Sequence, residues 1–199
     1  MAEDGAARRG NPAHPVPDHP VPDHPVPDPG AAVERHVLAP RAGAPNNPHL
    51  PLLVYRGAVG EGDRAAAFES LFAGNGWGGL WRDGIYGWHH FHTTAHEVLG
   101  IATGRVRVRF GGEEGIEVAL AAGDAVLIPA GVAHRNLESS PDFLAVGGYP
   151  PGQEPDMKGT GEAAQALPRI GRVPVPATDP LYGRDGPLTH LWHPEAGAI

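Results

Sequence analysis

The stretch GWHHFHTTAHEVLG, residues 87–100, holds four of the twelve histidines of the chain, and the last is followed directly by a glutamate. If WHHFH forms a β-strand, its side chains alternate between two faces, so His90 and His92 share one face. Their Cα atoms are then about 7 Å apart, which allows two imidazole rings to reach one metal ion. A turn through TTAH would bring Glu97, at the start of the next strand, beside them.

The other two histidines of this stretch, His89 and His96, are expected to point away from that site. His89 lies on the opposite face of the strand from His90, and His96 directly precedes Glu97. We expect each of them to be an outward residue or to orient a ligand through its second ring nitrogen.

A second stretch, GDAVLIPAGVAHRN at 123–136, places His134 on a strand that follows a Pro-x-Gly turn. Pairing of strands across a barrel could bring His134 to His90, His92 and Glu97. The two stretches together therefore predict one site built from three imidazoles and a carboxylate.

The segment between Trp77 and Tyr149 has the pattern of short strands joined by glycine-rich turns. RVRVRF at 105–110 alternates strictly, and IEVAL alternates again after the turn GGEEG. Strands at intervals of about 8–12 residues indicate a sandwich or barrel. The branched and aromatic side chains of RVRVRF should fill the barrel, which sends its arginines outward to solvent or an interface: Arg105, Arg107 and Arg109. Trp88 shares the ligand face and is a candidate for lining a cavity, whereas ordinary packing is expected of Trp77, Trp81 and Tyr86.

The spacing of these residues resembles the two signature motifs of the cupin superfamily. The first motif reads Gly84, five residues, His90-x-His92, four residues, Glu97, six residues, Gly104. The second reads Gly123, five residues, Pro129-x-Gly131, two residues, His134. The family pattern ends with an asparagine four places after the last histidine; here that place holds Glu138, and Asn136 comes two places after the histidine. This position does not bind metal in the family.

The resemblance implies an all-β fold, a single double-stranded β-helix (the RmlC-like jelly-roll barrel), with metal ligands His90, His92, Glu97 and His134. The flanking segments PNNPHLPLLVYRGAV, NGWGGLWRDGIY and GGYPPGQ resemble a narrower group, the functionally uncharacterised YjlB-like cupins. The alternative is a barrel in which the same histidines are buried and hydrogen-bonded without a metal.

Three imidazoles and one carboxylate suit one divalent transition metal, and the sequence does not choose among Fe, Mn, Ni, Cu and Zn. The chain has no cysteine, which argues against a closed structural zinc site. One carboxylate against a dication leaves a local charge near +1, which favours an anionic or enolate-forming ligand.

These features favour a metal-dependent enzyme that acts on a small molecule, with dioxygenase chemistry first and isomerase or decarboxylase chemistry next. Neither a general base nor any other catalytic residue can be named from the sequence. The alternative is a non-catalytic cupin module that binds or senses a small molecule, since one fold hosts both kinds of protein.

The formal net charge of −8 argues against a nucleic-acid partner, which would need a basic surface. No apolar run approaches the length of a membrane span or a signal sequence, so we expect a soluble cytoplasmic protein without a membrane partner. A homodimer is expected because apolar flanking residues need a surface to bury against: Leu52, Leu53, Val54, Leu188, Leu191 and Trp192.

The chain is expected to comprise four parts. Residues 1–31 carry the repeat HPVPD three times and should be a disordered proline-rich tail. Residues 32–76 should supply strands at 33–39 and 52–59, with a turn-rich loop between them, and a helix capped by Asp63 that ends near Gly74. Residues 77–150 form the cupin barrel. Residues 151–199 form a C-terminal extension with a short helix at 162–167 and an edge strand at 172–176.

Overall fold

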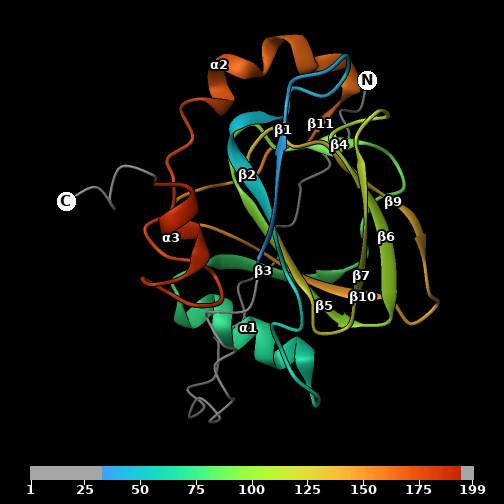
Figure 1. Cartoon of the computed structure of the whole chain (residues 1–199), viewed down its shortest axis with the longest axis vertical. Coiled ribbons are helices and arrows are strands. Elements are labelled where there is room, and N and C mark those ends of the chain that lie inside the picture. Colours follow the sequence, from blue (N-terminus) through green and yellow to red (C-terminus); the bar gives the residue numbers. More distant parts are fainter. Residues whose placement is uncertain (1–32, 194–199) are drawn as a thin grey trace, which may run out of the picture.

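The computed structural model describes residues 33–193, and its strands form two antiparallel sheets (Figure 1). The six-stranded sheet has the order β1-β2-β8-β5-β10-β3, and the five-stranded sheet has the order β11-β4-β9-β6-β7. The strands are β1 Glu34–Leu38, β2 Asn47–Tyr55, β3 Gly78–Asp83, β4 His90–Phe91, β5 Glu97–Thr103, β6 Arg105–Phe110, β7 Ile116–Ala121, β8 Ala125–Ile128, β9 His134–Ser139, β10 Leu144–Tyr149 and β11 Lys158–Gly159. This is the predicted all-β jelly-roll arrangement.

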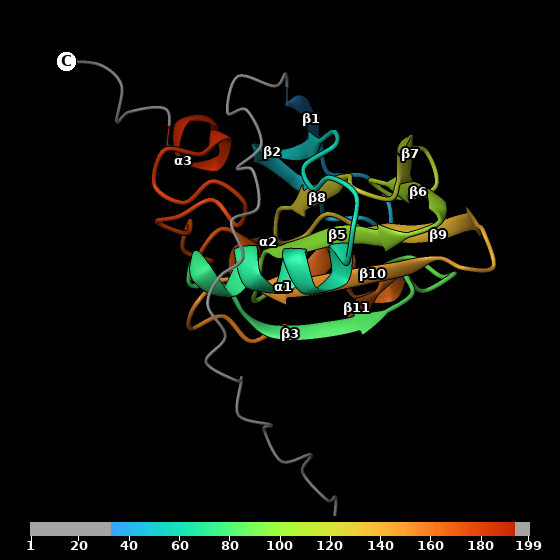
Figure 2. The ribbon, with the colours of Figure 1, turned by 90° about the horizontal axis from the view of Figure 1, so that it is seen from below.

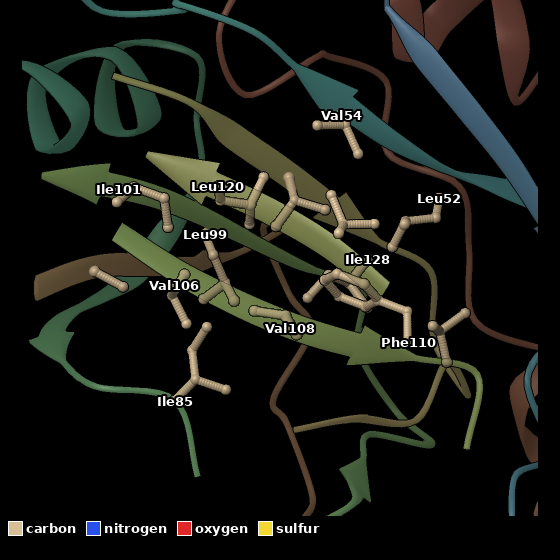
Figure 3. Close-up of a cluster of buried hydrophobic side chains, with 14 of the residues drawn as sticks. Leu52, Val54, Ile85, Leu99, Ile101, Val106, Val108, Phe110, Leu120 and Ile128 are labelled. Atoms are coloured by element: carbon tan, nitrogen blue, oxygen red, sulfur yellow. The ribbon is translucent and has the colours of Figure 1, made fainter. Parts of the chain in front are cut away.

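The main core lies between the two sheets, as the close-up in Figure 3 shows. Strict alternation in β6 buries Val106, Val108 and Phe110 in this core. The same alternation turns the three arginines of β6 outward, as predicted. Side chains of β2, β5 and β8 complete the core from the other sheet, and they include Leu52, Leu99 and Ile128.

Helix α1, Arg64–Gly74, covers the outer face of the six-stranded sheet over β5 and β10 (Figure 2). Its N-cap is Asp63, whose side chain accepts a hydrogen bond from the Ala66 N–H at 3.1 Å, as predicted. Phe68 of this helix lies against Gly100 so closely that a Cβ on Gly100 would stand 2.5 Å from the ring. The glycine therefore sets how closely the helix approaches the sheet.

Strand β2 begins at Asn47, so the loop expected at 41–51 is shorter than predicted. Two prolines lie within this strand, Pro48 and Pro51. They are tolerated because β2 pairs with β8 only from Leu53 to Tyr55, which leaves the earlier half of the strand with β1 as its one partner. Residues 32–76 thus contribute two strands to the larger sheet as well as the helix.

The C-terminal extension wraps back over the sheets as η1 Thr160–Gln165, α2 Leu167–Ile170 and α3 Pro187–Leu191 (Figure 1). The helix expected at 162–167 is a 3₁₀ helix that begins slightly earlier. The edge strand expected at 172–176 is wrong: these residues form no strand, since alternate prolines remove backbone donors.

A buried carboxylate anchors this extension. Asp179 is fully buried and accepts hydrogen bonds from the Tyr55 hydroxyl at 2.7 Å and from three backbone N–H groups. Near the end of the described chain, Trp192 donates to the Pro51 carbonyl at 2.9 Å.

The apolar flanks therefore bury against their own chain, and the argument that they need a partner loses its basis. The homodimer stays an untested prediction. The HPVPD tail lies outside the described residues, and no helix within 33–193 is long and apolar enough to cross a membrane.

Candidate metal centre

The structure brings the four predicted site residues together where the two sheets meet. His90 of β4 and His134 of β9 are register partners, with ring centroids 4.1 Å apart. His92 follows β4 directly, and Glu97 is the first residue of β5. Glu97 Oε2 lies 3.5 Å from Nε2 of His92 and 3.4 Å from Nε2 of His134. All four side chains are buried.

A backbone carbonyl orients each of the three histidines. Nδ1 of His90 faces the Trp88 carbonyl at 3.3 Å, and Nδ1 of His134 faces the Val132 carbonyl at 3.1 Å. Nδ1 of His92 meets the carbonyl of Asp156. A carbonyl can only accept, so each Nδ1 carries the hydrogen, and in the neutral ring Nε2 carries the lone pair. The three rings are therefore fixed in the tautomer that can bind a cation through Nε2.

The two oxygens of Glu97 have different surroundings. Oε1 accepts a hydrogen bond from the Tyr149 hydroxyl at 3.1 Å. Oε2 is buried without a hydrogen-bond partner, because the two imidazole nitrogens stand beyond normal hydrogen-bond length. Burial alone would raise the pKa of Glu97, but His92 and His134 outweigh burial and hold this pKa well below its usual value.

The buried cluster shifts the pKa values of His90 and His92 in opposite directions. Burial and the neighbouring His134 lower the pKa of His90 to about 3. Burial would also lower the pKa of His92, but the charge of Glu97 and the contact with the Asp156 carbonyl raise it overall. Without a metal ion, the ionised carboxylate of Glu97 therefore favours a proton on His92.

Tyr149 and Trp81 support Glu97 from behind. The Trp81 indole N–H donates to the Tyr149 hydroxyl at 3.1 Å, and that hydroxyl donates to Glu97. Burial and the charge of Glu97 raise the pKa of Tyr149, so the phenol stays a donor. Trp81 lies over Gly147 of the adjacent strand, where a Cβ would stand 2.0 Å from the indole ring.

Asp156 of the C-terminal extension holds His92 in place. Its carboxylate accepts hydrogen bonds of 2.6 Å from both the N–H and the hydroxyl of Thr93, and a third bond of 3.2 Å from Thr94. These bonds position the backbone carbonyl of Asp156 over the His92 ring. Directly afterwards, β11 pairs with β4, so the extension forms part of the wall around the site.

The turn before His134 is held by two adjacent asparagines, Asn46 and Asn47. The Asn46 side chain accepts from the Ala133 N–H at 3.3 Å, and its backbone N–H donates to the Gly131 carbonyl at 2.9 Å. Asn47 donates to the Ala130 carbonyl at 3.2 Å. Asn46 has a φ of 51°, a left-handed conformation that asparagine adopts more readily than most residues.

A cavity of about 290 Å³ opens above the cluster. Its floor includes the four site residues, and its wall combines apolar and aromatic side chains with the two charged residues Arg82 and Asp83. Trp81 and Tyr86 line this cavity, although the sequence suggested ordinary packing for both. Trp77 is a buried packing residue, as predicted. Trp88, which the sequence suggested as a cavity residue, does not line this cavity; it is half exposed and packs on Tyr86 and His90.

His89 and His96 stay outside the cluster. His96 is fully buried, accepts from the Ala130 N–H at 2.9 Å and packs on Trp192. His89 is buried with its Nε2 3.7 Å from Glu113. Sequence reasoning missed Tyr149 and Met157 of the wall and Asp156 beside His92, because only the path of the later strands and of the extension brings them to the site.

Within residues 33–193, no group of three or more histidine, aspartate or glutamate side chains stands ready-made as a metal site. What the chain provides is a set of oriented imidazoles around one unpartnered carboxylate oxygen.

Residues 80–141 match the family model described as "Cupin domain". The chain is also 40% identical over 151 residues to the uncharacterized protein YjlB of Bacillus subtilis (strain 168), across 74% of this chain and 89% of that protein. The chain belongs to the cupin family. A cupin assignment agrees with the two antiparallel sheets and with the position of the histidine cluster between them.

Solved structures resemble this cupin more remotely. Acireductone dioxygenase from Bacillus anthracis, which carries a cadmium ion in its active centre, has a TM-score of 0.33 and 18% identity; the match covers 46% of this cupin and 62% of that chain, less than two thirds of its length. RmlC from Streptococcus suis, in complex with dTDP-D-xylose, has a TM-score of 0.31 and 15% identity over 60% of this cupin and 70% of that chain. Procruciferin from Brassica napus has a TM-score of 0.32 and 12% identity over 57% of this cupin and 28% of that chain. Likenesses this remote indicate no function for this cupin.

Proposed function

We propose that this cupin binds one divalent transition-metal ion per chain through His90, His92, Glu97 and His134, and that it acts as a metal-dependent enzyme on a small molecule in the cavity. The observation that carries the proposal is the buried Oε2 of Glu97. It has no hydrogen-bond donor, and two imidazole Nε2 atoms face it at 3.4 and 3.5 Å.

The carboxylate oxygen and the two imidazole nitrogens that face it would be stabilised by a cation between them. In the tautomers set by the carbonyls, the lone pairs of two nitrogens and a carboxylate oxygen point toward one another without a donor between them. Such a buried contact is costly unless a proton or a metal ion lies among the three atoms.

The separations support a metal ion. Two ligand atoms that each lie about 2.1 Å from one ion are about 3.4 Å apart at the tetrahedral angle and about 3.0 Å apart at a right angle. The observed 3.4 and 3.5 Å are therefore close to ligand–ligand distances. Imidazole and carboxylate together suit Fe, Mn, Ni, Cu or Zn.

When bound, such an ion supplies a Lewis acid and open coordination positions for substrate or dioxygen. The chain's own residues do the remaining work. Tyr149 holds Glu97 so that Oε2 faces the histidines, Asp156 fixes the ring of His92, and the apolar wall of the cavity limits access of water.

Oxygenase chemistry is the favoured reaction class. An isomerase needs a protein group that accepts and returns a proton. Tyr149 has a raised pKa and is tied to Glu97, while Arg82 is ion-paired with Glu69. The described wall thus offers few proton-transfer groups besides the exposed Asp83 carboxylate, which supports chemistry centred on the ion. A non-catalytic binding module remains the alternative outcome of the test below.

Elemental analysis of protein purified without added metal or a histidine tag tests the metal site. We expect about one equivalent of a transition metal in the wild type and most of it lost in His92→Ala. His89→Gln is the matched control, because His89 lies outside the cluster and this variant should keep its metal. A full equivalent of metal in a folded His92→Ala protein would show that the ligand assignment is wrong.

Turnover distinguishes an enzyme from a binding module. Oxygen consumption by the metal-loaded protein is compared with that of His92→Ala over a panel of small organic molecules. A metal-loaded wild type that binds ligands in the panel yet consumes oxygen with none of them would favour the non-catalytic module.

A further inference from the structure

The wall of the cavity carries little free charge. Arg82 is the one arginine or lysine among the described residues that line it. Its Nε and one terminal nitrogen each donate a 2.7 Å hydrogen bond to a separate carboxylate oxygen of Glu69 on α1. A paired guanidinium of this kind is held in a fixed plane by both bonds. Arg82 is therefore oriented toward α1, and its charge is compensated by Glu69.

Asp83, the second charged residue of the wall, disfavours anionic ligands. The Asp83 carboxylate accepts the Gly84 N–H at 2.7 Å and carries a negative charge at the rim. A phosphate or carboxylate entering the cavity would meet this charge and find no unpaired cation on the wall to replace its lost water.

The rest of the wall is apolar and largely aromatic. Ile85 and Leu99 belong to the buried core and also face the cavity. At the mouth, Tyr86 and Met157 are 51% and 46% exposed, although both are large apolar side chains. Exposed apolar side chains gathered around a cavity are typical of a binding groove.

The aromatic side chains favour a flat ligand. The Tyr86 ring meets the His90 ring edge-on at 5.2 Å, and Met157 has the adaptable thioether that packs well on aromatic rings. Flat conjugated molecules gain from edge and stacking contacts with such walls. The cavity volume of about 290 Å³ lies near the lower limit of about 300–1,000 Å³ for ligand pockets, which restricts the ligand to a small molecule.

We propose that the cavity selects a small, flat, conjugated molecule that is uncharged except at the oxygen it presents to the histidine cluster, a hydroxyl on an sp² carbon. The Arg82–Glu69 pair is the selectivity element, because it removes the one wall cation that would hold a second anionic group. This inference rests on the proposed function for the ligand's oxygen, whereas the exclusion of a second charge rests on the wall alone.

Two probes that differ only at the far end of one ring test the proposal. 4-Methylcatechol and 3,4-dihydroxybenzoate share the hydroxyl groups and differ by a methyl group against a carboxylate. Each is titrated calorimetrically into zinc-loaded protein under nitrogen, since zinc is redox-inert. We expect 4-methylcatechol to bind about tenfold more tightly or better, because an unpaired carboxylate loses its hydration in the cavity. Benzoate, titrated alone, measures binding through the carboxylate end.

Releasing Arg82 should weaken the preference. In Glu69→Gln the guanidinium loses its anionic partner, so the affinity ratio of 4-methylcatechol to 3,4-dihydroxybenzoate should fall about fivefold or more. Glu138→Gln is the matched control. It breaks the 3.2 Å ion pair between Glu138 and Arg107, which lies away from the cavity, and it should leave the affinity ratio unchanged.

A second pair of variants tests the aromatic wall. Tyr86→Ala should weaken binding of 4-methylcatechol about tenfold through loss of a ring contact. Val37→Ala removes an exposed apolar side chain from β1 and should have no effect.

The outcomes separate this inference from the proposed function. The charge selectivity is overturned if the wild type binds 3,4-dihydroxybenzoate as tightly as 4-methylcatechol, or more tightly, and does not bind benzoate with matching affinity. An unchanged affinity ratio in Glu69→Gln overturns it too. If the wild type takes up no metal, the proposed function fails, yet the preference for methyl over carboxylate should persist in weaker titrations of the metal-free protein because the wall sets it.

Discussion

The hydroxyl of Tyr149 donates a 3.1 Å hydrogen bond to Oε1 of Glu97 and leaves Oε2 as the oxygen that faces the histidines. This single bond distinguishes the two oxygens of the carboxylate. A bound ion would thus meet Glu97 through one oxygen, in an orientation that Tyr149 and the Trp81 indole behind it maintain.

Loss of this hydroxyl should weaken metal binding. Tyr149→Phe keeps the ring but frees Oε1 of Glu97. Loss of a hydrogen-bond partner of a metal ligand typically lowers the affinity for the metal by about 10–100-fold. Competition with a chelator measures the dissociation constant. Tyr86→Phe removes a hydroxyl from another ring that lines the cavity and serves as the control. Equal affinities for Tyr149→Phe and the wild type would show that Glu97 needs no such support.

The Asp156 carboxylate should matter for the same reason, at the other end of the cluster. Asp156→Ala removes the bonds to Thr93 and Thr94, so the carbonyl over His92 loses its fixed position. We expect weaker metal binding, by about tenfold, together with a lower midpoint of thermal unfolding. Glu154→Ala removes a carboxylate two residues earlier and should leave metal affinity unchanged. Wild-type affinity in Asp156→Ala would mean that the backbone alone holds the carbonyl in place.

Gly147 should be intolerant of a side chain. The Cβ of Gly147→Ala would lie 2.0 Å from the Trp81 ring, so the indole must move and its bond to Tyr149 is lost. We expect the free energy of unfolding, measured with urea, to fall by about 1–3 kcal/mol. Gly78→Ala lies in the same strand as Trp81, meets nothing within 4 Å, and is the control. A stable Gly147→Ala protein with unchanged tryptophan fluorescence would contradict this packing.

Removal of the ion should destabilise the fold. Without a cation, Glu97 Oε2 remains buried and unpartnered, and an ion that binds only the folded chain raises its stability by mass action. At an ion concentration about 100 times the dissociation constant, addition of a chelator should lower the Tm by about 5–10 °C. His92→Ala should show no such change. An identical shift in both proteins would indicate an effect of the chelator itself.

The parts of this site that could be predicted are those encoded over short distances. Alternation over WHHFH predicts that His90 and His92 share one face, although only His90–Phe91 forms a strand, and the spacing to Glu97 needs only a turn. His134 required a pairing across the barrel, which the resemblance to cupins implied and the register of β4 with β9 shows. The metal-ligand assignment of these four residues stays a proposal.

The supporting residues could not be predicted, because tertiary pairing decides them. Trp81 was interpreted as packing, and only Gly147 opposite it leaves room for the indole to lie over β10. Asp156 follows a proline- and glycine-rich segment without a periodic pattern, so nothing local indicated that its carbonyl meets His92. The prolines of β2 misled in the same way, since the half of the strand that holds them lies outside the pairing with β8.

The contact between Asp156 and His92 also imposes an order of events during synthesis. Chains are made from the N-terminus, and a nascent chain can expose His90, His92, Glu97 and His134 before Asp156 exists. At that stage the ring of His92 lacks its carbonyl and β4 lacks β11. On the proposed metal site, an ion would be bound tightly only after the extension has left the ribosome, and a truncated translation product that ends near residue 150 would carry all four proposed ligands yet bind a metal loosely.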